Sequence, residues 1–371
     1  MRILMVSKAL VVGTYQRKLE ELAALPGVEL LAVVPPAWRE GVHTLRYEPL
    51  FRHGYETVLL PMALNGHYHL HFYPRLRSVI RRFRPDIIHL DEEPADMVAF
   101  QCVALAGQAR LIFFTWQNLL RRVPPPFSLI QRRTFQRASL ALCGNQDAVG
   151  VLRAKGYTGP TRIVPQFGFD TDLFGYHAKT CLPDQPFLIG AAGRLVPEKG
   201  MDLVLRAAAL LDVAWRLEIA GDGPELAALR RQAAALGVAD RVCFLGRRPS
   251  AAMPALLQRW DVLVMASRSR PNWKEQFGRA AVEAMSCGTP VVVARSAELP
   301  NVVGDAGLSF PEDDLPALVD CLNQLAASPQ LCSQLGAAGR SRVLAHFTQR
   351  AVATATYAAY QAVLTTPRCT P

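Results

Sequence analysis

The stretch FLIGAAGRLVPEKGMDLVLRAAALL, residues 187–211, contains one strand, one turn and one helix pattern. An apolar run ends in the small residues Gly190 to Gly193, a loop follows with Arg194 and Lys199, and apolar residues then recur at helical spacing. A strand that is apolar on consecutive positions suits a parallel sheet covered on both faces. The stretch therefore predicts a βα unit whose loop lies at the carboxyl edge of a sheet.

This unit recurs along the chain. Short apolar runs alternate with Ala- and Leu-rich helical patterns: RILMVS, VELLAVVP, DIIHL, RLIFFTW and LALCG, then FLIGAAG, RLEIAGDG, RVCFLG, DVLVMAS and PVVVA. The alternation predicts a doubly wound α/β fold. Residues 163–187 are rich in Pro, Gly and Asp and follow neither period, so we expect five strands before this break and at least five after it.

With 371 residues the chain is long enough for two domains that each bury a core. We predict a Rossmann-like domain over residues 1–166, a linker over 167–185 and a second Rossmann-like domain over 186–348. Residues 349–371 are predicted to form a helix that packs back across the interface. Two such domains are expected to face each other across a cleft, with ligand at the carboxyl ends of their strands.

The composition is that of a globular protein, with 50% hydrophobic and 19% charged residues. The apolar runs fall well short of the roughly 18 residues that indicate a membrane span. The opening MRILMVSKALVVG is interpreted as a first strand and loop rather than a signal peptide, so a cytoplasmic location is expected. Eight scattered cysteines predict neither a zinc site nor a disulfide framework.

The positive charge lies mainly in the first half. Residues 1–166 carry 21 Lys and Arg against 12 Asp and Glu, whereas the remainder carries 20 against 19. Two arginine-rich stretches, residues 73–86 and 119–137, supply five arginines each. They form either solvated helix faces or a surface that attracts an acidic acceptor or anionic lipid. No binding motif accompanies the charge, so nucleic acid is not expected.

The stretch NWKEQFGRAAVEAMSCGTPVVV, residues 272–293, predicts a short helix between Gly278 and Gly288. A helix N-terminus favours an anion, and glycine lets a ligand approach the backbone. An acid before the helix would repel phosphate, so Glu275 suits the hydroxyl groups of the same ligand. The alternative is that Glu275 only favours the helix dipole and that Glu283 is a surface acid.

Two cations follow the strand that ends near Gly193. Arg194 and Lys199 are well placed to hold a diphosphate, and an arginine can do so through two parallel hydrogen bonds. The alternative is that both are ordinary surface charges. The sequence Gly221-Asp222-Gly223 predicts a tight turn after another strand of the same sheet.

These sequence elements, in this order along the chain, resemble those of family 4 glycosyltransferases of the GT-B fold. The matching elements are Gly168 in VPQFGFDTDLF, Gly193-Arg194 with Glu198-Lys199-Gly200, Gly221-Asp222-Gly223, and the E-x7-E signature from Glu275 to Glu283 with EAMSCGTPVVV behind it. The resemblance implies transfer of a sugar from a nucleotide-sugar donor, with retention of configuration and without a metal or other cofactor. A glycan, a lipid-linked molecule or a small molecule would be the acceptor, as in polysaccharide or glycolipid biosynthesis.

The resemblance also implies roles for individual residues. Arg194 and Lys199 would neutralise the departing diphosphate, and Glu275 would hold hydroxyl groups of the donor sugar. The residues implied for donor binding are Gly13, Gly193, Gly221, Phe277, Gly278 and Glu283. Among these, Glu283 would accept hydrogen bonds from the ribose hydroxyls, and Gly13 would let the first glycine loop approach the phosphates.

The first half departs from the family pattern. Relatives often carry a His at the end of the fourth strand, where this sequence has Trp116. Trp116 is therefore either a residue that stacks on the acceptor or contacts the donor sugar, or a core tryptophan. His89 in PDIIHLDEEPAD is either structural or an acceptor contact. Glu298 and Asn301 stand where many relatives have Gly-Gly and Glu. Same-face attack needs little from a protein base, because a donor phosphate oxygen can take the acceptor proton.

Three other functions compete with this interpretation. A sugar-nucleotide 2-epimerase of the same fold would change its substrate without an acceptor. A dehydrogenase would require a G-x-G-x-x-G sequence after the first strand, which is absent. A non-catalytic nucleotide-sugar or glycan-binding subunit would be expected to have lost the charged donor residues.

Overall fold

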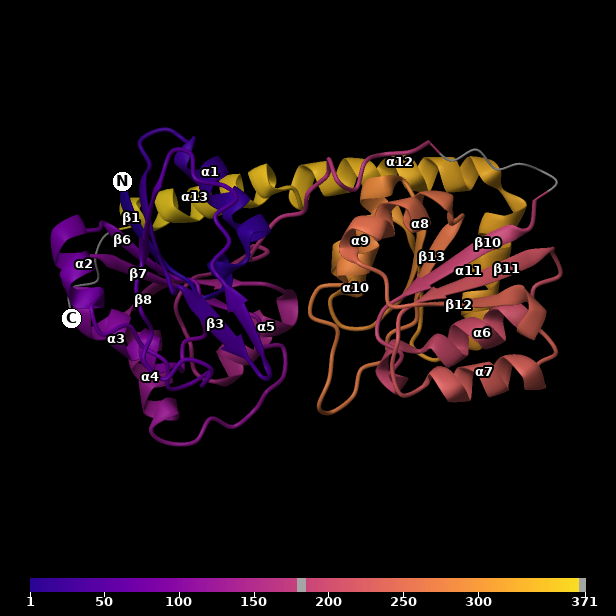
Figure 1. The fold of residues 1–371 in the computed structure, drawn as a ribbon, viewed down its shortest axis with the longest axis horizontal. Coiled ribbons are helices and arrows are strands. Elements are labelled where there is room, and N and C mark those ends of the chain that lie inside the picture. Colours follow the sequence, from indigo (N-terminus) through magenta and orange to yellow (C-terminus); the bar gives the residue numbers. More distant parts are fainter. Residues whose placement is uncertain (179–184, 367–371) are drawn as a thin grey trace. The chain divides into compact units, whose positions relative to one another are not determined.

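A computed structural model describes residues 1–178 and 185–366, and they form two compact units (Figure 1). The first unit comprises Met1–Gly168 and the segment that begins at Gln349, and the second comprises Phe169–Thr348. The chain therefore passes between the units after Gly168 and again after Thr348. Residues 179–184 of the expected linker and 367–371 of the expected C-terminal helix lie outside the described residues.

The first unit contains a parallel sheet of seven strands in the order β5-β2-β1-β6-β7-β8-β9. The strands are β1 (Arg2–Val6), β2 (Glu29–Val34), β5 (Glu56–Leu59), β6 (Ile87–Leu90), β7 (Arg110–Thr115), β8 (Ala138–Cys143) and β9 (Thr161–Ile163). The helices are α1 (Arg17–Ala23), α2 (Leu76–Phe83), α3 (Met97–Leu105), α4 (Phe127–Arg137), α5 (Gln146–Ala154) and α13 (Gln349–Thr365).

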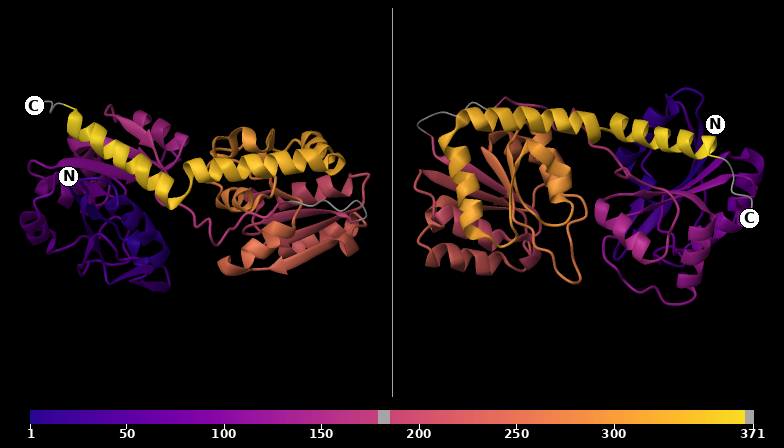
Figure 2. Two further views of the ribbon diagram at one scale, coloured as in Figure 1. Left: turned by 90° about the horizontal axis from the view of Figure 1, so that it is seen from above. Right: turned by 180° about the vertical axis from the view of Figure 1, so that it is seen from behind.

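Both faces of this sheet are buried, as consecutive apolar residues predict. On β1, Leu4 and Val6 belong to the cluster that packs under α2 and α3, whereas Ile3 and Met5 belong to the cluster under α1 and α13. Alternating side chains of one strand thus pack against helices on opposite faces of the sheet. Figure 2 shows α13 in yellow along the first unit. No helix among the described residues is both long and apolar enough to cross a bilayer.

The sequence pattern missed four strands of the first unit. Strands β5 and β9 are the two edge strands of the sheet, and β3 (Ala37–Glu40) and β4 (His43–Arg46) form a separate antiparallel hairpin. All four are short, and most of their residues are partly or fully exposed. An edge strand or exposed hairpin has no need of a continuous apolar run, so hydrophobic periodicity does not detect it.

The second unit contains a parallel sheet of six strands in the order β12-β11-β10-β13-β14-β15. The strands are β10 (Phe187–Ala192), β11 (Trp215–Ala220), β12 (Val242–Gly246), β13 (Val262–Met265), β14 (Val291–Ala294) and β15 (Leu308–Phe310). The helices are α6 (Met201–Ala209), α7 (Leu226–Ala235), α8 (Met253–Arg259), α9 (Arg279–Cys287), α10 (Leu299–Val303), α11 (Leu315–Ala327) and α12 (Pro329–His346).

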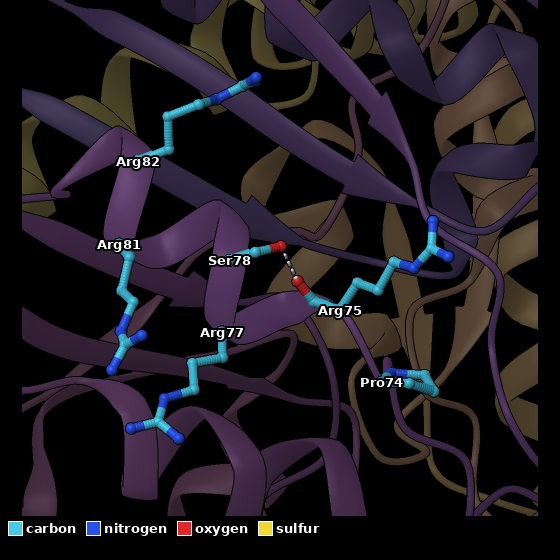
Figure 3. Close-up of a pocket in the computed structure, with 6 residues that line it drawn as sticks. All are labelled: Pro74, Arg75, Arg77, Ser78, Arg81 and Arg82. Atoms are coloured by element: carbon cyan, nitrogen blue, oxygen red, sulfur yellow. Dashed lines mark hydrogen bonds between the residues drawn. The ribbon is translucent and has the colours of Figure 1, made fainter.

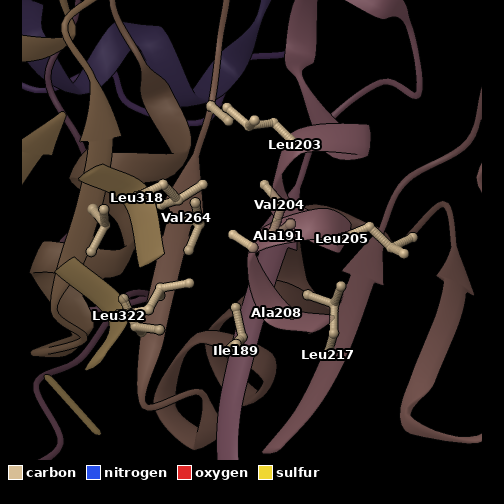
Figure 4. Packing of buried hydrophobic residues seen from close by; sticks show 14 of the residues in the cluster. Ile189, Ala191, Leu203, Val204, Leu205, Ala208, Leu217, Val264, Leu318 and Leu322 are labelled. Atoms are coloured by element: carbon tan, nitrogen blue, oxygen red, sulfur yellow. The ribbon is translucent and has the colours of Figure 1, made fainter. Parts of the chain in front are cut away.

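One face of the second sheet packs against α6 and α11. Figure 4 shows Ala191 of β10 beside Val204 of α6 and Ile189 near Ala208, with Leu318 of α11 among the side chains of the same buried cluster. Burying an aliphatic side chain of this size contributes about 1.5–3 kcal/mol. The packed core therefore holds β10 in position, and with it the start of the loop that carries Arg194 and Lys199.

The strand order places a switch point in each sheet. In the first sheet, β1 lies between β2 and β6, and in the second, β10 lies between β11 and β13. The chain reverses its winding direction at these central strands, so the flanking loops diverge and leave room at the carboxyl ends. Arg194 and Lys199 follow β10, and Lys8 follows β1.

Candidate active site

Lys199 and Glu275 meet in the second unit, although they lie 76 positions apart in the sequence. The Lys199 Nζ donates to Glu275 Oε2 at 2.6 Å, and the two side chains are only 17% and 13% exposed. The same ammonium lies 5.2 Å from the centroid of the Trp273 ring. Ser267 Oγ also donates to Glu275 Oε2, at 3.4 Å. The structure thus joins two sequence-predicted residues in one ion pair.

Arg194 lies on the same loop as Lys199, but its side chain is exposed. Within the described residues, no hydrogen bond or ion pair engages its guanidinium. A guanidinium offers five N–H donors in a fixed plane, which matches the oxygens of a phosphate. The loop therefore presents one free cation beside a paired one.

Arg268, which was not among the residues predicted from the sequence, holds this loop in place. Its guanidinium donates to both carboxylate oxygens of Asp202, at 2.6 and 2.8 Å, and to Asp313 at 2.5 Å. It also donates to the Pro197 carbonyl at 3.1 Å, within the turn that carries Lys199. Burial alone would raise the pKa of Asp202, but the bonds from Arg268 lower it. A single buried arginine after an apolar strand, as in VMASRS, is the signal that could have indicated it.

Gly221 has a structural reason to be glycine. A Cβ at this position would lie 1.8 Å from the Gly193 carbonyl oxygen, and the residue has a φ of +159°. The neighbouring backbones are also hydrogen-bonded, because Leu195 N donates to the Asp222 carbonyl at 2.9 Å. Gly221 therefore lets its loop pack directly on the Gly193 backbone at the sheet edge. The contact of Gly193 and Gly221 with a donor stays a prediction.

Helix α9 begins as the sequence predicts, after Gly278 with a φ of +84°. Glu283 lies within α9 and is 7% exposed, and Arg279 Nε donates to its Oε1 at 2.7 Å. Burial raises the pKa of Glu283, and the neighbouring Arg279 only partly opposes this. Glu283 is consequently a buried acid, so the alternative of an ordinary surface acid is wrong.

The Phe277 side chain is partly buried and packs against the core of the second unit. Its ring stacks on Phe169 with centroids 5.7 Å apart and meets Phe347 edge to face at 5.6 Å. This packing anchors the residue just before α9, so ligand contact at this position would come from its backbone. Farther along, Asn301 Nδ2 donates to Glu298 Oε2 at 3.2 Å, which links the two residues that depart from the family pattern.

In the first unit, Gly13 is buried and begins a short 3-10 helix, Gly13–Gln16. A Cβ there would lie 2.5 Å from Leu50 Cγ and 2.9 Å from the Glu48 carbonyl oxygen. Glycine is thus required here because the segment around Gly13 lies close to the segment that contains Glu48 and Leu50. A role for Gly13 at the donor phosphates stays a prediction.

The burial of His89 favours the structural alternative over an acceptor contact. Its side chain is 0% exposed, and Nδ1 lies 2.6 Å from the Tyr360 hydroxyl of α13. Burial holds the pKa of His89 well below its ordinary value, and the nearby Lys18 lowers it further. His89 therefore joins α13 to β6 as a neutral core residue.

Trp116 is also held by the protein. Its Nε1 donates to Gln166 Oε1 at 2.9 Å, and its backbone N donates to Glu93 Oε1 at 2.9 Å. A Cβ on Gly144 would lie 2.1 Å from the indole ring, so the ring packs directly on that glycine. These contacts favour the core alternative for Trp116, and its contact with a sugar stays a prediction.

A buried ionic network lies at the carboxyl ends of β1 and β6, and it was not predicted from the sequence. Lys8 forms an ion pair with Glu92, and His71 Nε2 lies 2.9 Å from Glu92 Oε2. Burial alone would raise the pKa of Glu92, but Lys8 and His71 lower it to about 2. Ligand atoms of His71, Glu92 and Asp96 lie within 4.8 Å of one another. The Lys8 ammonium already supplies the positive charge that a metal ion would bring.

His69 and Asp96 form a second polar pair beside this network. His69 Nδ1 lies 2.7 Å from Asp96 Oδ1, and the His69 side chain is 55% exposed whereas that of Asp96 is 4% exposed. The hydrogen bond to Asp96 raises the pKa of His69. Such a pair orients an imidazole with its second nitrogen toward solvent or a ligand. The histidine-rich stretch GHYHLHF, residues 66–72, is the sequence signal for this site.

Comparison with known proteins identifies similar chains. The family model described as glycosyl transferases group 1 matches residues 175–342. The GDP-mannose-dependent alpha-(1-6)-phosphatidylinositol monomannoside mannosyltransferase of Mycolicibacterium smegmatis is 34% identical over 241 residues, 58% of this chain and 62% of that protein. The D-inositol 3-phosphate glycosyltransferase of Salinispora tropica is 34% identical over 181 residues, 46% of this chain and 35% of that protein. The chain thus spans less than two thirds of either relative.

Solved structures resemble the chain over nearly its whole length. Anabaena Alr3699/HepE in complex with UDP has a TM-score of 0.69 and 20% identity, and the match covers 98% of this chain and 100% of that one. At this identity the likeness concerns the fold. It confirms the predicted class of two Rossmann-like domains.

Proposed function

Residues 175–342 belong to the glycosyl transferases group 1 family, and from this premise we propose that the chain transfers a sugar from a nucleotide-sugar donor to an acceptor hydroxyl. The proposed reaction retains the configuration at the anomeric carbon and uses no bound metal. The observation that carries the proposal is the Lys199–Glu275 ion pair beside the free Arg194 guanidinium, at the carboxyl end of β10. Two cations and one acid there match a ligand with both phosphate and hydroxyl groups.

Donor binding would change the hydrogen-bond partners of Lys199 and Glu275. Diphosphate oxygens would compete with Glu275 for the Lys199 ammonium and would also bind Arg194. The Glu275 carboxylate would then be released to accept hydrogen bonds from hydroxyls of the donor sugar. The ion pair thus keeps both side chains in position before the donor arrives.

Glu283 and the start of α9 would hold the rest of the donor. One oxygen of Glu283 is bonded to Arg279, and the carboxylate as a whole can accept further hydrogen bonds from the ribose hydroxyls. The backbone at Gly278 would present N–H groups of a helix N-terminus to an anionic or polar part of the donor. With these roles, the second unit would supply all the proposed donor contacts except that of Gly13.

In the proposed reaction, the bond between the anomeric carbon and the diphosphate oxygen breaks as the acceptor oxygen bonds to the same face of that carbon. The acceptor proton passes to an oxygen of the departing diphosphate. Negative charge develops on that leaving group, so fixed cations such as Arg194 and Lys199 stabilise the transition state more than the ground state. The positive charge that a metal supplies in other enzymes would come from these side chains.

For the acceptor, we propose a glycan or lipid-linked molecule that carries phosphate. Both relatives described above are named for acceptors that contain inositol and phosphate. In the first unit, the exposed His69 beside Asp96 and the nearby Lys8 offer hydrogen-bond donors to such a molecule. The proposed location is cytoplasmic, and a lipid-linked acceptor would require contact with the inner membrane face.

The test is thermal unfolding with GDP, UDP, ADP, NAD and the common sugar conjugates, with and without chelator. A ligand at 100 times its dissociation constant adds about 2.7 kcal/mol to the free energy of unfolding. We expect one nucleoside diphosphate and its sugar conjugate to stabilise the chain equally well in chelator. Arg194→Ala should weaken this effect, whereas Arg206→Ala, an exposed arginine of α6, should not. Stabilisation by NAD alone, or by no compound, would contradict the proposal.

A further inference from the structure

The Glu283 carboxylate lies where burial opposes its negative charge. Its side chain is 9% exposed, and it belongs to the run of buried residues from Ala281 to Cys287 on α9. Burial disfavours the charged form of a carboxyl group. Only the ionised form can accept hydrogen bonds from two hydroxyl groups without presenting a proton of its own. Recognition of a ribose diol by Glu283 therefore requires a neighbour that keeps the carboxylate charged.

Arg279 is this neighbour, one helical turn before Glu283. Its Nε donates to Glu283 Oε1 at 2.7 Å. Within the described residues, no other group forms a hydrogen bond or ion pair with this carboxylate. Burial raises the pKa of Glu283, whereas the hydrogen bond and the charge of Arg279 lower it. The arginine thus offsets part of the effect of burial on the carboxylate.

No other charged side chain in the described part of the chain performs this function. Helices α8, α10 and α12 and strands β13 and β14 pack against α9. The charged groups and histidines on these elements or at their ends are Arg259, Glu298, Arg340, Arg342 and His346. None of these groups changes the pKa of Glu283. The charge state of Glu283 therefore depends on Arg279.

The position of Arg279 is not explained by the stability of the helix. Arg279 is the first residue of α9, at the positive end of the helix dipole. A cation is unfavourable at this end, and an ion pair four positions apart is weaker when the cation precedes the acid. The pair consequently contributes little to the helix itself. This favours a role for the arginine in the site that contains Glu283.

An aromatic ring also restrains the Arg279 side chain. Its Cζ lies 5.5 Å from the centroid of the Phe169 ring, and this ring stacks on Phe277. The Phe169 backbone N donates to the Phe347 carbonyl at 2.7 Å, which holds the ring in place. A guanidinium over a ring and beside a carboxylate has little rotamer freedom left. The Glu283 carboxylate is therefore oriented before any ligand binds.

We propose that Arg279 is a positioning residue for nucleotide recognition: it keeps the Glu283 carboxylate charged and oriented, so that both ribose hydroxyl groups donate to it. The arginine acts through Glu283 rather than on the ligand. The inference rests on the proposed function, in which Glu283 binds the ribose. It adds that discrimination of the ribose depends on the charge at position 279 and on pH.

The test uses pairs of ligands that differ only in the ribose hydroxyl groups. GDP is compared with 2′,3′-dideoxy-GDP, and the corresponding UDP and ADP pairs are measured in parallel. Titration calorimetry of the whole chain at several pH values between 5 and 8 gives the dissociation constants. The diphosphate ionises alike in both members of a pair. The ratio of the two constants, here called the ribose preference, therefore isolates the hydroxyl contacts.

Two substitutions of Arg279 are compared with a matched control. R279Q removes the positive charge and R279K keeps it, whereas R77Q removes an exposed arginine of α2. In Figure 3, Arg77 extends away from α2, and within the described residues no ion pair engages it. We expect a ribose preference of about tenfold or more in wild type and R77Q, as hydrogen bonds to a charged group would give.

R279Q should lower the ribose preference to roughly threefold or less at pH 7 and leave the affinity for the dideoxy ligand unchanged. R279K should restore most of the preference. Loss of Arg279 raises the pKa of Glu283, so the carboxylate takes up a proton at a higher pH. As pH falls, the ribose preference should therefore disappear at a higher pH in R279Q than in wild type. Thermal midpoints without ligand would show that the variants fold.

A double-mutant cycle separates an indirect from a direct role. E283Q should lack the ribose preference, and addition of R279Q to E283Q should change neither dissociation constant. A further loss in the double variant would overturn the inference. Equal weakening of both ligands by R279Q would also overturn it, because Arg279 would then bind the diphosphate itself.

The remaining outcomes distinguish the inference from the proposed function. A ribose preference that R279Q leaves unchanged at every pH would overturn the inference alone. Wild type that binds a nucleoside diphosphate without ribose preference would overturn the inference together with the role of Glu283. Wild type that binds none of the three nucleoside diphosphates would contradict the proposed function, and the inference would fail with it.

Discussion

At the level of single side chains, Lys199 is held by opposite charge and by an aromatic ring. Its ammonium contacts the Glu275 carboxylate at 2.6 Å and lies over the Trp273 ring. Such an arrangement fixes a long, flexible side chain in one position, so little rotamer entropy remains to be lost when a ligand arrives. The unpaired Arg194 has no comparable restraint.

Replacement of either cation should affect turnover. We expect Lys199→Ala and Arg194→Ala each to lower turnover at least tenfold, because each removes a charge that would stabilise the leaving diphosphate. Arg206→Ala is the control and should retain normal turnover. Steady-state rates with saturating donor would test this, together with thermal midpoints to exclude misfolding. Near-normal turnover in both variants would remove these residues from the mechanism.

Asp91 should make stability depend on pH. It is buried, and burial raises its pKa to about 6, although Lys18 and the bonds from Ser7 and Gln166 oppose the rise. Between its ordinary pKa of 3.8 and about 6, the folded chain binds more protons than the unfolded chain. The contribution of Asp91 to the free energy of unfolding therefore falls as pH rises through this window, by up to about 3 kcal/mol.

The variant Asp91→Asn isolates this effect, because an amide does not titrate but can still accept the bonds from Ser7 and Gln166. We expect the variant to gain stability relative to wild type as pH rises from 4 to 7. Chemical unfolding at several pH values would measure the difference. Parallel curves for the two proteins would mean that Asp91 is ionised in the folded chain throughout this range.

At the level of elements, α12 fixes the position of α9 by close packing. A Cβ on Gly336 would lie 2.2 Å from the Gly288 carbonyl oxygen, and one on Gly339 would lie 3.0 Å from Met285 Cγ. Glycines on α12 thus let it approach the C-terminal end of the helix that carries Glu283. The residues of α9 that are proposed to bind the donor depend on this contact for their placement.

Gly336→Ala should consequently destabilise the chain, although alanine favours a helix. We expect a loss of about 1–3 kcal/mol in the free energy of unfolding, because the added methyl group meets backbone that cannot move alone. Gly150→Ala is a matched control within α5, where a Cβ would meet nothing within 4 Å. It should stabilise by about 0.5–1 kcal/mol. Chemical unfolding followed by circular dichroism would measure both changes, and equal effects would exclude the packing account.

At the level of the whole molecule, the chain forms two units with separate cores. All residues proposed to bind the donor, except Gly13, belong to the second unit. Helix α13 belongs to the first unit, where Val352 and Tyr360 enter the core. Binding of the donor should therefore stabilise the second unit more than the first.

Hydrogen exchange with the stabilising nucleoside diphosphate would test this distribution. We expect slower exchange in peptides that cover residues 187–211 and 275–287, because bound ligand suppresses local opening. Strands β6 and β8 of the first unit should change little. Protection confined to the first unit would mean that the nucleotide site has been assigned to the wrong unit.

The sequence predicted much of the fold and part of the site for identifiable reasons. Apolar runs specified the central strands, and Gly278 and Gly288 specified the ends of α9, because these features depend on neighbours in the chain. The edge strand β9 escaped prediction, and the sequence left open whether His89 is structural or an acceptor contact. Each depends on which distant segment covers the residue, and in the case of His89 that segment is α13.

The sequence by itself determined the alternating βα order, the loop with Arg194 and Lys199, and the spacing of Glu275 and Glu283. Local periodicity and turn residues encode such features directly. Only the tertiary structure decided that Lys199 pairs with Glu275, that Arg268 secures their loop and that Gly221 packs on Gly193. These contacts join residues far apart in the sequence, and they exist only because burial of two sheet faces brings the strand ends together.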